Sequence, residues 1–183
     1  RTILDNKVLS DIMEKTKENG KALHLTGLMS DGGVHSHISH ILGVVEMAKE
    51  KGLNEVYIHA IMDGRDTPPK SGVNYLKDLE DGLKKIGIGK TASVVGRYYA
   101  MDRDTNWERT EEAYDLMTLG SGIKAKSSDE AITGAYSRDE TDEFVKATII
   151  INEDGTPVAT VNDGDGIIFC NFRPDRARQL TRA

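Results

Sequence analysis

The feature that most constrains the fold of this 183-residue chain is an alternation of helix-like and strand-like segments over its first 120 residues. Apolar residues recur at helical spacing over residues 4–13, 38–48, 73–86 and 107–119, and Gly20, Gly52 and Gly87 stand after the first three as stops. Mostly apolar runs at 22–29, 56–62 and 91–95 are typical of buried strands. This order predicts an α/β fold, in which helices cover both faces of a mainly parallel sheet to give three α/β/α layers.

The rest of the chain departs from this alternation. Ser127 and Glu130 have the spacing of a capping box, which predicts a short helix toward Tyr136. Residues 146–152 and 158–162 are rich in β-formers and are separated by a turn-like Glu-Asp-Gly-Thr, so we expect a small β-hairpin excursion near residues 146–162. Pro157 places the start of its second arm at an edge, and residues 166–170 read as one more buried strand.

Composition excludes several classes of protein. The chain has 24 basic and 30 acidic residues, and its net charge of −6 argues against a general nucleic-acid binder. No apolar run approaches the roughly 18 residues of a membrane span. Cys170 is the one cysteine, which excludes a disulfide framework and favours a reducing, cytoplasmic location.

The two ends of the sequence suggest a truncated domain. The sequence begins with Arg1, not with an initiator Met, and leads directly into a helical pattern. At the other end, Ala183 closes a basic segment that reads as unfinished. The length fits one domain. We therefore expect residues 1–183 to form a single truncated domain of a longer polypeptide.

Arginines gather where the predicted strands end. The ligand crevice of an open parallel sheet lies beyond the carboxyl ends of its strands. Arginine binds carboxylate and phosphate in a bidentate manner that lysine cannot reproduce, so this placement predicts a small anionic ligand. Six of the ten arginines follow strands: Arg65, Arg97, Arg103, Arg173, Arg176 and Arg178. Neighbouring carboxylates offer the alternative of purely structural ion pairs: Asp63, Asp66, Asp102, Asp104 and Asp175.

The histidines offer a second alternative. His35 and His37, with Asp31 and Asp63, could form the metal site of a metal-dependent hydrolase. Against this, His37 and His40 are expected on the second helix, where their spacing suits packing equally well. The two histidines within strands, His24 and His59, are expected to be satisfied core residues, and residues 163–166 to form a tight turn rather than a calcium loop.

Four motifs resemble one known family. They are GLMSDGGVHSH (27–37), HAIMDGRDTPP (59–69), GRYYAMDRD (96–104) and NFRPDRAR (171–178). Together they are similar to the signatures of the cofactor-independent (2,3-bisphosphoglycerate-independent) phosphoglycerate mutases, in the same order and over nearly the whole chain from Ala22 onward.

The resemblance implies part of an isomerase that interconverts 3-phosphoglycerate and 2-phosphoglycerate in glycolysis and gluconeogenesis. The family enzyme has a metal-binding phosphatase-like domain and an inserted substrate-binding, or phosphotransferase, domain, and this chain resembles most of the inserted one. In the family, a serine of the other domain takes the phosphoryl group with two manganese ions, and a lysine there contacts the substrate. We therefore expect no metal or cofactor on this chain, no mutase activity from it alone, and the phosphatase-like domain as its partner in cis. A stand-alone anion-binding module remains the alternative.

The family's substrate contacts can be carried over residue by residue. Asp66 would accept a hydrogen bond from a glycerate hydroxyl and assist its deprotonation, and His35 would donate to a phosphate oxygen. The arginines would supply planar cations for carboxylate and phosphate. The matching positions are His35, Arg65, Asp66, Arg97, Arg103, Arg173 and Arg176.

Overall fold

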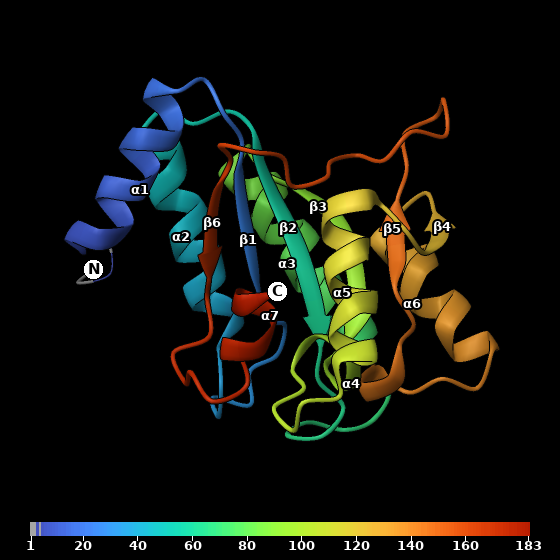
Figure 1. The fold of residues 1–183 in the computed structure, drawn as a ribbon. Helices are drawn as coiled ribbons and strands as arrows, with labels where there is room; N and C mark the ends of the chain where they lie inside the picture. Colours follow the sequence, from blue (N-terminus) through green and yellow to red (C-terminus); the bar gives the residue numbers. More distant parts are fainter. Residues whose placement is uncertain (1–2, 4) are drawn as a thin grey trace.

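A six-stranded sheet forms the centre of the computed structural model, which describes residue 3 and residues 5–183 (Figure 1). Its strands follow the order β4-β5-β3-β2-β1-β6, and every neighbouring pair is parallel except β3 and β5. The mainly parallel α/β architecture is therefore confirmed. The strands are β1 (Leu23–Leu28), β2 (Val56–Met62), β3 (Lys90–Gly96), β4 (Ile123–Ala125), β5 (Thr148–Ile150) and β6 (Gly166–Phe169).

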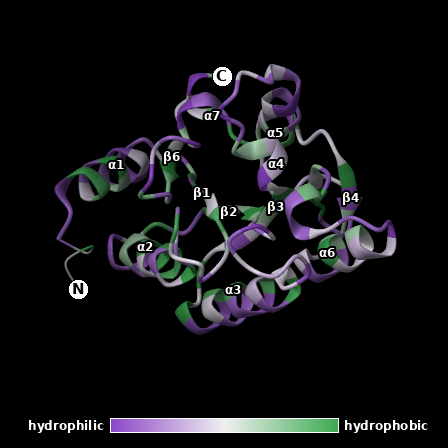
Figure 2. Ribbon diagram, turned by 90° about the horizontal axis from the view of Figure 1, so that it is seen from below, coloured by the Kyte–Doolittle hydropathy of each residue, from purple (hydrophilic) through white to green (hydrophobic). Residues whose placement is uncertain are grey.

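Helices cover both faces of this sheet, as the three-layer prediction requires (Figure 2). One face carries α1 (Lys7–Glu18), α2 (Ile38–Glu50), α3 (Gly72–Ile86) and α6 (Ser128–Ser137). The other carries α4 (Arg97–Ala100), α5 (Trp107–Leu119) and α7 (Arg178–Arg182), and a 3-10 turn, η1 (Asp142–Phe144), packs beside α4. Within the described part of the chain, no helix has the length and apolar character needed to cross a membrane.

The core consists of two apolar layers, one on each side of the sheet. Alternate residues of a strand point to opposite faces, so adjacent positions such as Val94 and Val95 contribute to different layers. Leu25 and Ile58 pack on the α1–α2–α3–α6 side, whereas Leu28 and Ile61 pack beneath α4 and α5. Burial of each such side chain stabilises the fold by about 1.5–3 kcal/mol.

The predicted helix ends are explained by their caps. Gly87 has a φ of +87° and donates its N–H to Leu83 O, which ends α3 at Ile86. Ser127 Oγ accepts from Glu130 N at 3.1 Å and so starts α6, although the Glu130 carboxylate accepts from Lys126 N rather than closing the box on Ser127.

The first helix begins later than predicted. Asn6 Oδ1 accepts from Leu9 N at 3.2 Å, so Asn6 is the N-cap and α1 starts at Lys7. Leu4, with which the predicted pattern opened, lies outside the described residues.

The predicted β-hairpin over residues 146–162 is present as a turn but has no second strand. Its first arm is β5, which belongs to the main sheet, antiparallel to β3 and parallel to β4. Its second arm, residues 158–162, forms no strand, and a single bridge between Ile151 and Pro157 closes the turn. The physical reason is burial: Thr148 and Ile149 are almost fully enclosed within the sheet, and Pro157 has no N–H with which to extend a ladder.

Candidate functional site

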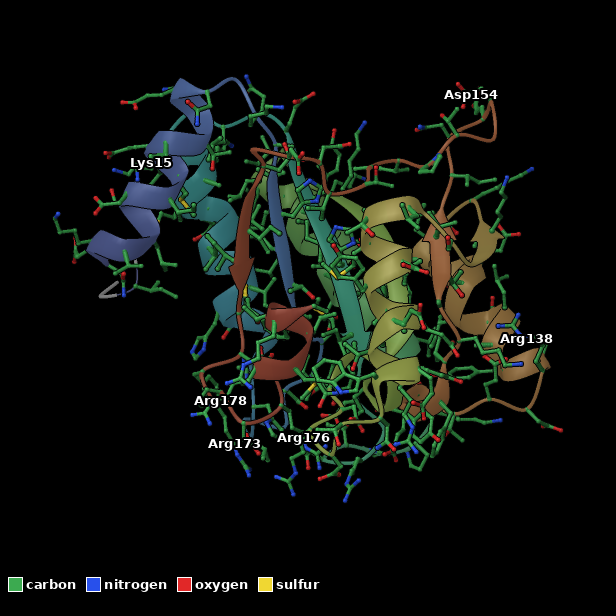
Figure 3. All side chains as sticks on the ribbon, viewed as in Figure 1. Lys15, Arg138, Asp154, Arg173, Arg176 and Arg178 are labelled. Carbon is green, nitrogen blue, oxygen red and sulfur yellow. The ribbon has the colours of Figure 1, made fainter. Side chains whose placement is uncertain are left out.

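Five arginines line a cleft of about 330 Å³ at the carboxyl ends of β2 and β3. Figure 3 shows Arg173 and Arg176 at this edge of the molecule, far from Arg138 at the end of α6. Three carboxylates share the cleft, so cations outnumber anions here although the whole chain is acidic. The charged lining is Arg65, Arg97, Arg103, Arg109, Arg176, Asp102, Asp104 and Glu143, accompanied by Tyr98, Met101 and Phe144.

Arg97 is the buried cation of this cleft and follows directly on β3. Its Nη1 lies 2.7 Å from Asp63 Oδ1 and 2.6 Å from Asp66 Oδ2. Burial raises the pKa of Asp63, but the hydrogen bonds from Asp66 N, Ser30 Oγ and Arg97 outweigh it, and the pKa falls below its usual value. The ionised Asp63 carboxylate therefore holds the Arg97 guanidinium in place.

His35 lies between two carboxylates. Its Nε2 is 4.0 Å from Asp66 Oδ2 and its Nδ1 is 3.9 Å from Asp175 Oδ1. The side chain is 3% exposed, and the buried Nδ1 forms no hydrogen bond with the described residues. Burial lowers the pKa of His35, and the charges of Arg97 and Arg173 lower it further, so the imidazole is neutral at pH 7 and carries a single N–H, although His35 does not itself line the cleft.

Asp175 joins two of the predicted arginines. Arg103 Nη1 lies 2.8 Å from Asp175 Oδ2, and Arg173 Nε lies 2.9 Å from Oδ1. Both arginine side chains are nearly half exposed, so each keeps donors accessible from solvent. Arg173 is thus tied to the cleft through Asp175, although it does not itself line it.

Arg176 lies among the other positive charges of the cleft. Its Nη1 donates to Met101 O at 3.1 Å. Burial lowers the pKa of Arg176, as do the neighbouring charges of Arg103, Arg97 and Arg65, against which Asp175 acts in the opposite direction. An arginine remains protonated even so, and a bound anion would relieve this repulsion.

Arg109 lines the cleft but was not predicted from sequence. Its guanidinium lies over the Tyr98 ring, 4.0 Å from the centroid, and its Nη1 is 3.4 Å from Asp102 Oδ1. A signal was present: Arg109 shares a helical stripe of α5 with buried Ala113 and Leu116. An arginine on an inward-facing stripe indicates a charged partner beneath it.

Glu143 was also missed, and its position has a backbone cause. Its Oε1 lies 3.5 Å from Arg65 Nη1. The backbone of η1 presses on Gly96, where a Cβ would lie 2.2 Å from Glu143 O, and on Gly64, where it would lie 2.7 Å from Glu143 N. Only glycine allows this approach, and neither residue signals it in the sequence.

The histidines of the metal-site alternative have separate partners. His37 is the N-cap of α2, where its Nδ1 accepts from Ser39 N, whereas His40 packs edge-on against Phe172. Among residues 3 and 5–183, no group of three or more histidine, cysteine or carboxylate side chains could hold a metal ion. His24 and His59 are fully buried and hydrogen-bonded to each other, as predicted.

Comparison with known proteins agrees with this architecture. The family model described as BPG-independent PGAM N-terminus (iPGM_N) matches residues 1–183. The 2,3-bisphosphoglycerate-independent phosphoglycerate mutase of Clostridium perfringens (strain 13 / Type A) is 57% identical over 182 residues, which are 100% of this chain and 35% of that protein. The enzyme of the same name from Salmonella paratyphi B is 53% identical, over 100% of this chain and 36% of its own length.

A solved structure extends the likeness to three dimensions. The phosphoglycerate mutase of Leishmania mexicana, determined at low cobalt concentration, superposes with a TM-score of 0.94 and 34% identity over 99% of this chain and 34% of its own. The chain spans about a third of the length of these relatives. It belongs to the BPG-independent phosphoglycerate mutase family, of which it represents the N-terminal iPGM_N domain.

Proposed function

We propose that this chain is the substrate-binding, or phosphotransferase, domain of an enzyme that interconverts 3-phosphoglycerate and 2-phosphoglycerate. The observation that supports it most directly is the cleft at the carboxyl edge of the sheet, where Arg65, Arg97, Arg103 and Arg176 share one lining. A three-carbon acid phosphate carries a carboxylate and a phosphate, and its recognition needs several guanidinium groups in one place. Family membership makes this substrate the first choice among small anions.

In this proposal the chain binds and orients the substrate. The arginines bind carboxylate and phosphate oxygens and neutralise charge as the phosphoryl group moves. His35, neutral and with a single N–H, donates to an anionic oxygen. Asp66, held beside Arg97, accepts the proton of a glycerate hydroxyl that lies within its reach.

The remaining chemistry belongs to a part of the enzyme outside this sequence. The relatives are nearly three times as long, and we assign to their remaining length the phosphatase-like domain with its serine, its lysine and its two manganese ions. The residues that the structure describes provide no cluster of three or more metal ligands. A cytoplasmic location belongs to the same proposal and rests on the lone Cys170 and on family membership.

Calorimetry with 3-phosphoglycerate tests the site. Arg103→Ala and Arg173→Ala each remove a half-exposed side chain that forms charge-assisted hydrogen bonds, so each is expected to weaken binding by about 10- to 100-fold. Arg138→Ala is the matched control, because Arg138 is comparably exposed and paired with Glu140 just after α6, away from the cleft. Equal affinity in all three variants would refute the site.

Turnover separates the proposal from a stand-alone anion-binding module. The 183-residue chain is expected to bind 3-phosphoglycerate weakly, because part of the pocket wall is not its own, and to show no mutase turnover with manganese supplied. Fused to the remaining two-thirds of a relative, it is expected to restore turnover. A fusion that binds substrate without turnover would favour the binding module.

A further inference from the structure

Asp102 is the most heavily hydrogen-bonded carboxylate at the cleft. Its side chain is 4% exposed, and it lies in the loop between α4 and α5, next to Arg103. One oxygen accepts from Asp104 N at 3.1 Å and from Asn106 N at 2.9 Å. The other accepts from Asn106 Nδ2 at 2.9 Å and lies 3.4 Å from Arg109 Nη1. These bonds tie the loop that carries Arg103 to itself and to the start of α5.

Gln179 extends this network to α7. Its Nε2 donates to Asp102 Oδ2 at 2.8 Å and lies 2.7 Å from Thr110 Oγ1, and its Oε1 accepts from Thr105 N at 3.1 Å. Thr105 has a φ of +63°, a left-handed conformation that a β-branched residue adopts only when its surroundings hold it there. Asp102 and Gln179 together therefore fix the shape of the Arg103 loop.

The same link aligns Arg176 with Arg103. Arg176 precedes α7 and donates to Met101 O at 3.1 Å, so its guanidinium is anchored to the residue directly before Asp102. The neighbouring positive charges of Arg103 and Arg176 repel each other, and the ion pair that Arg103 forms with Asp175 does not include Arg176. The free protein therefore needs another device to keep the two cations convergent.

We propose that Asp102 is a positioning residue, which holds Arg103 and Arg176 at the spacing that an anionic ligand requires before that ligand arrives. Both of its oxygens are already occupied by donors from the protein, so its action passes through the arginines and not through contact with the ligand. The inference rests on the proposed function for the identity of the ligand, while the arrangement of the arginines can be tested without any ligand.

A double-mutant cycle provides the first test. Asp102→Asn is expected to raise the Kd of the chain for 3-phosphoglycerate about tenfold, because the amide cannot accept at both positions. In an Arg103→Ala background the same change is expected to weaken binding by clearly less than tenfold, since one of the two arginines through which Asp102 acts is gone. Gln179→Leu, which cuts the link to α7 without changing charge, is expected to weaken binding similarly and serves if Asp102→Asn folds poorly.

Asp165→Asn is the matched control. Asp165 is a buried carboxylate that holds Ala22 N, Asn162 N and His24 before β6, away from the cleft. Its loss is expected to lower Tm but leave the Kd unchanged. If Asp102→Asn also lowered Tm without changing Kd, or if its effect were undiminished in the Arg103→Ala background, the positioning role would be wrong.

A ligand-free measurement separates this inference from the proposed function. The side-chain Nε–H NMR signals of Arg103 and Arg176 are expected to shift in Asp102→Asn, while that of Arg138 stays in place. Unchanged Arg103 and Arg176 signals would overturn the inference even if the chain bound 3-phosphoglycerate. Shifted signals with no binding of 3-phosphoglycerate to the wild-type chain would support the inference and refute the proposed function.

Discussion

Two rows of polar and titratable groups, one within the sheet and one beyond the carboxyl ends of its strands, differ in how many of their donors and acceptors are already paired. Within the sheet, His24 Nε2 lies 3.3 Å from Asp165 Oδ2, His24 Nδ1 lies 3.0 Å from His59 Nε2, and His59 Nδ1 lies 2.7 Å from Ser93 Oγ. An ionised Asp165 can only accept, which fixes the direction of every bond from Ser93 to His59 to His24 to Asp165. With both histidines neutral, this row is closed.

The row beyond the carboxyl ends is not closed. Arg97 has its two carboxylates, but Arg65 and Arg176 have no such close pair, and Nδ1 of His35 is without a hydrogen bond among the described residues. The comparison shows that burial of charged and polar groups does not identify a binding site by itself. The distinguishing property is a surplus of guanidinium groups that line an open cleft.

The largest expected effect tests whether Arg97 belongs to the closed or the open kind. Arg97→Ala would leave buried Asp63 without its cation, so the free energy of unfolding is expected to fall by about 3–5 kcal/mol. Urea denaturation measures this. Arg138→Ala, which breaks a more exposed pair, is expected to cost under about 1 kcal/mol. If the two variants lost the same amount, Arg97 would contribute no special support to the fold.

How far the sequence predicts the fold depends on whether an element is long enough to show a period. The helix ending at Gly87 and the strand at residues 56–62 were correct because apolar spacing and a left-handed cap act locally. β4 has three residues, two of them exposed, and α4 has four, so neither could display a pattern. The partner of β5 could not be predicted because a strand's pattern does not say which edge it joins.

The features of the site also divide into those that a local pattern predicts and those that it does not. Ligands lie beyond the carboxyl ends of parallel strands, and this rule predicts one shared cleft without any knowledge of side-chain directions. The structure has one cleft lined by Arg65, Arg97, Arg103 and Arg176. The pairing of Asp175 with Arg103 spans 72 residues and depends on how two loops fold together. Such a contact has no local signature.

The second effect is a pH dependence of the free energy of unfolding, which comes from His59 in the closed row. Burial lowers the pKa of His59 to about 3, below the 6.5 of an unfolded histidine. As the pH falls below 6.5 the unfolded chain takes up a proton that the folded chain refuses, so His59 reduces the free energy of unfolding by about 1.4 kcal/mol per pH unit toward pH 3. His59→Asn is expected to make the slope between pH 6 and pH 5 shallower by that amount, measured by urea denaturation.

This window is chosen to isolate histidine. Carboxylates of the arginine cleft contribute at lower pH, since their unfolded pKa values are near 4. His40→Asn, which removes an exposed histidine, is expected to leave the slope unchanged. A slope that stayed the same in His59→Asn would mean that the histidine row does not keep its neutral form.

The smallest expected effect on stability is that of Arg65→Ala. The Arg65 side chain is 58% exposed and 3.5 Å from Glu143, so its removal should change the free energy of unfolding by less than about 0.5 kcal/mol. Its effect on 3-phosphoglycerate should be far larger, and Arg65→Lys should recover the charge but not the two-pronged hydrogen bonding. Thermal denaturation and calorimetry on the same samples give both numbers. If Arg65 belongs to the open row, its removal must weaken binding and leave the fold intact. A loss of stability as large as that of Arg97→Ala would place Arg65 among the structural ion pairs instead.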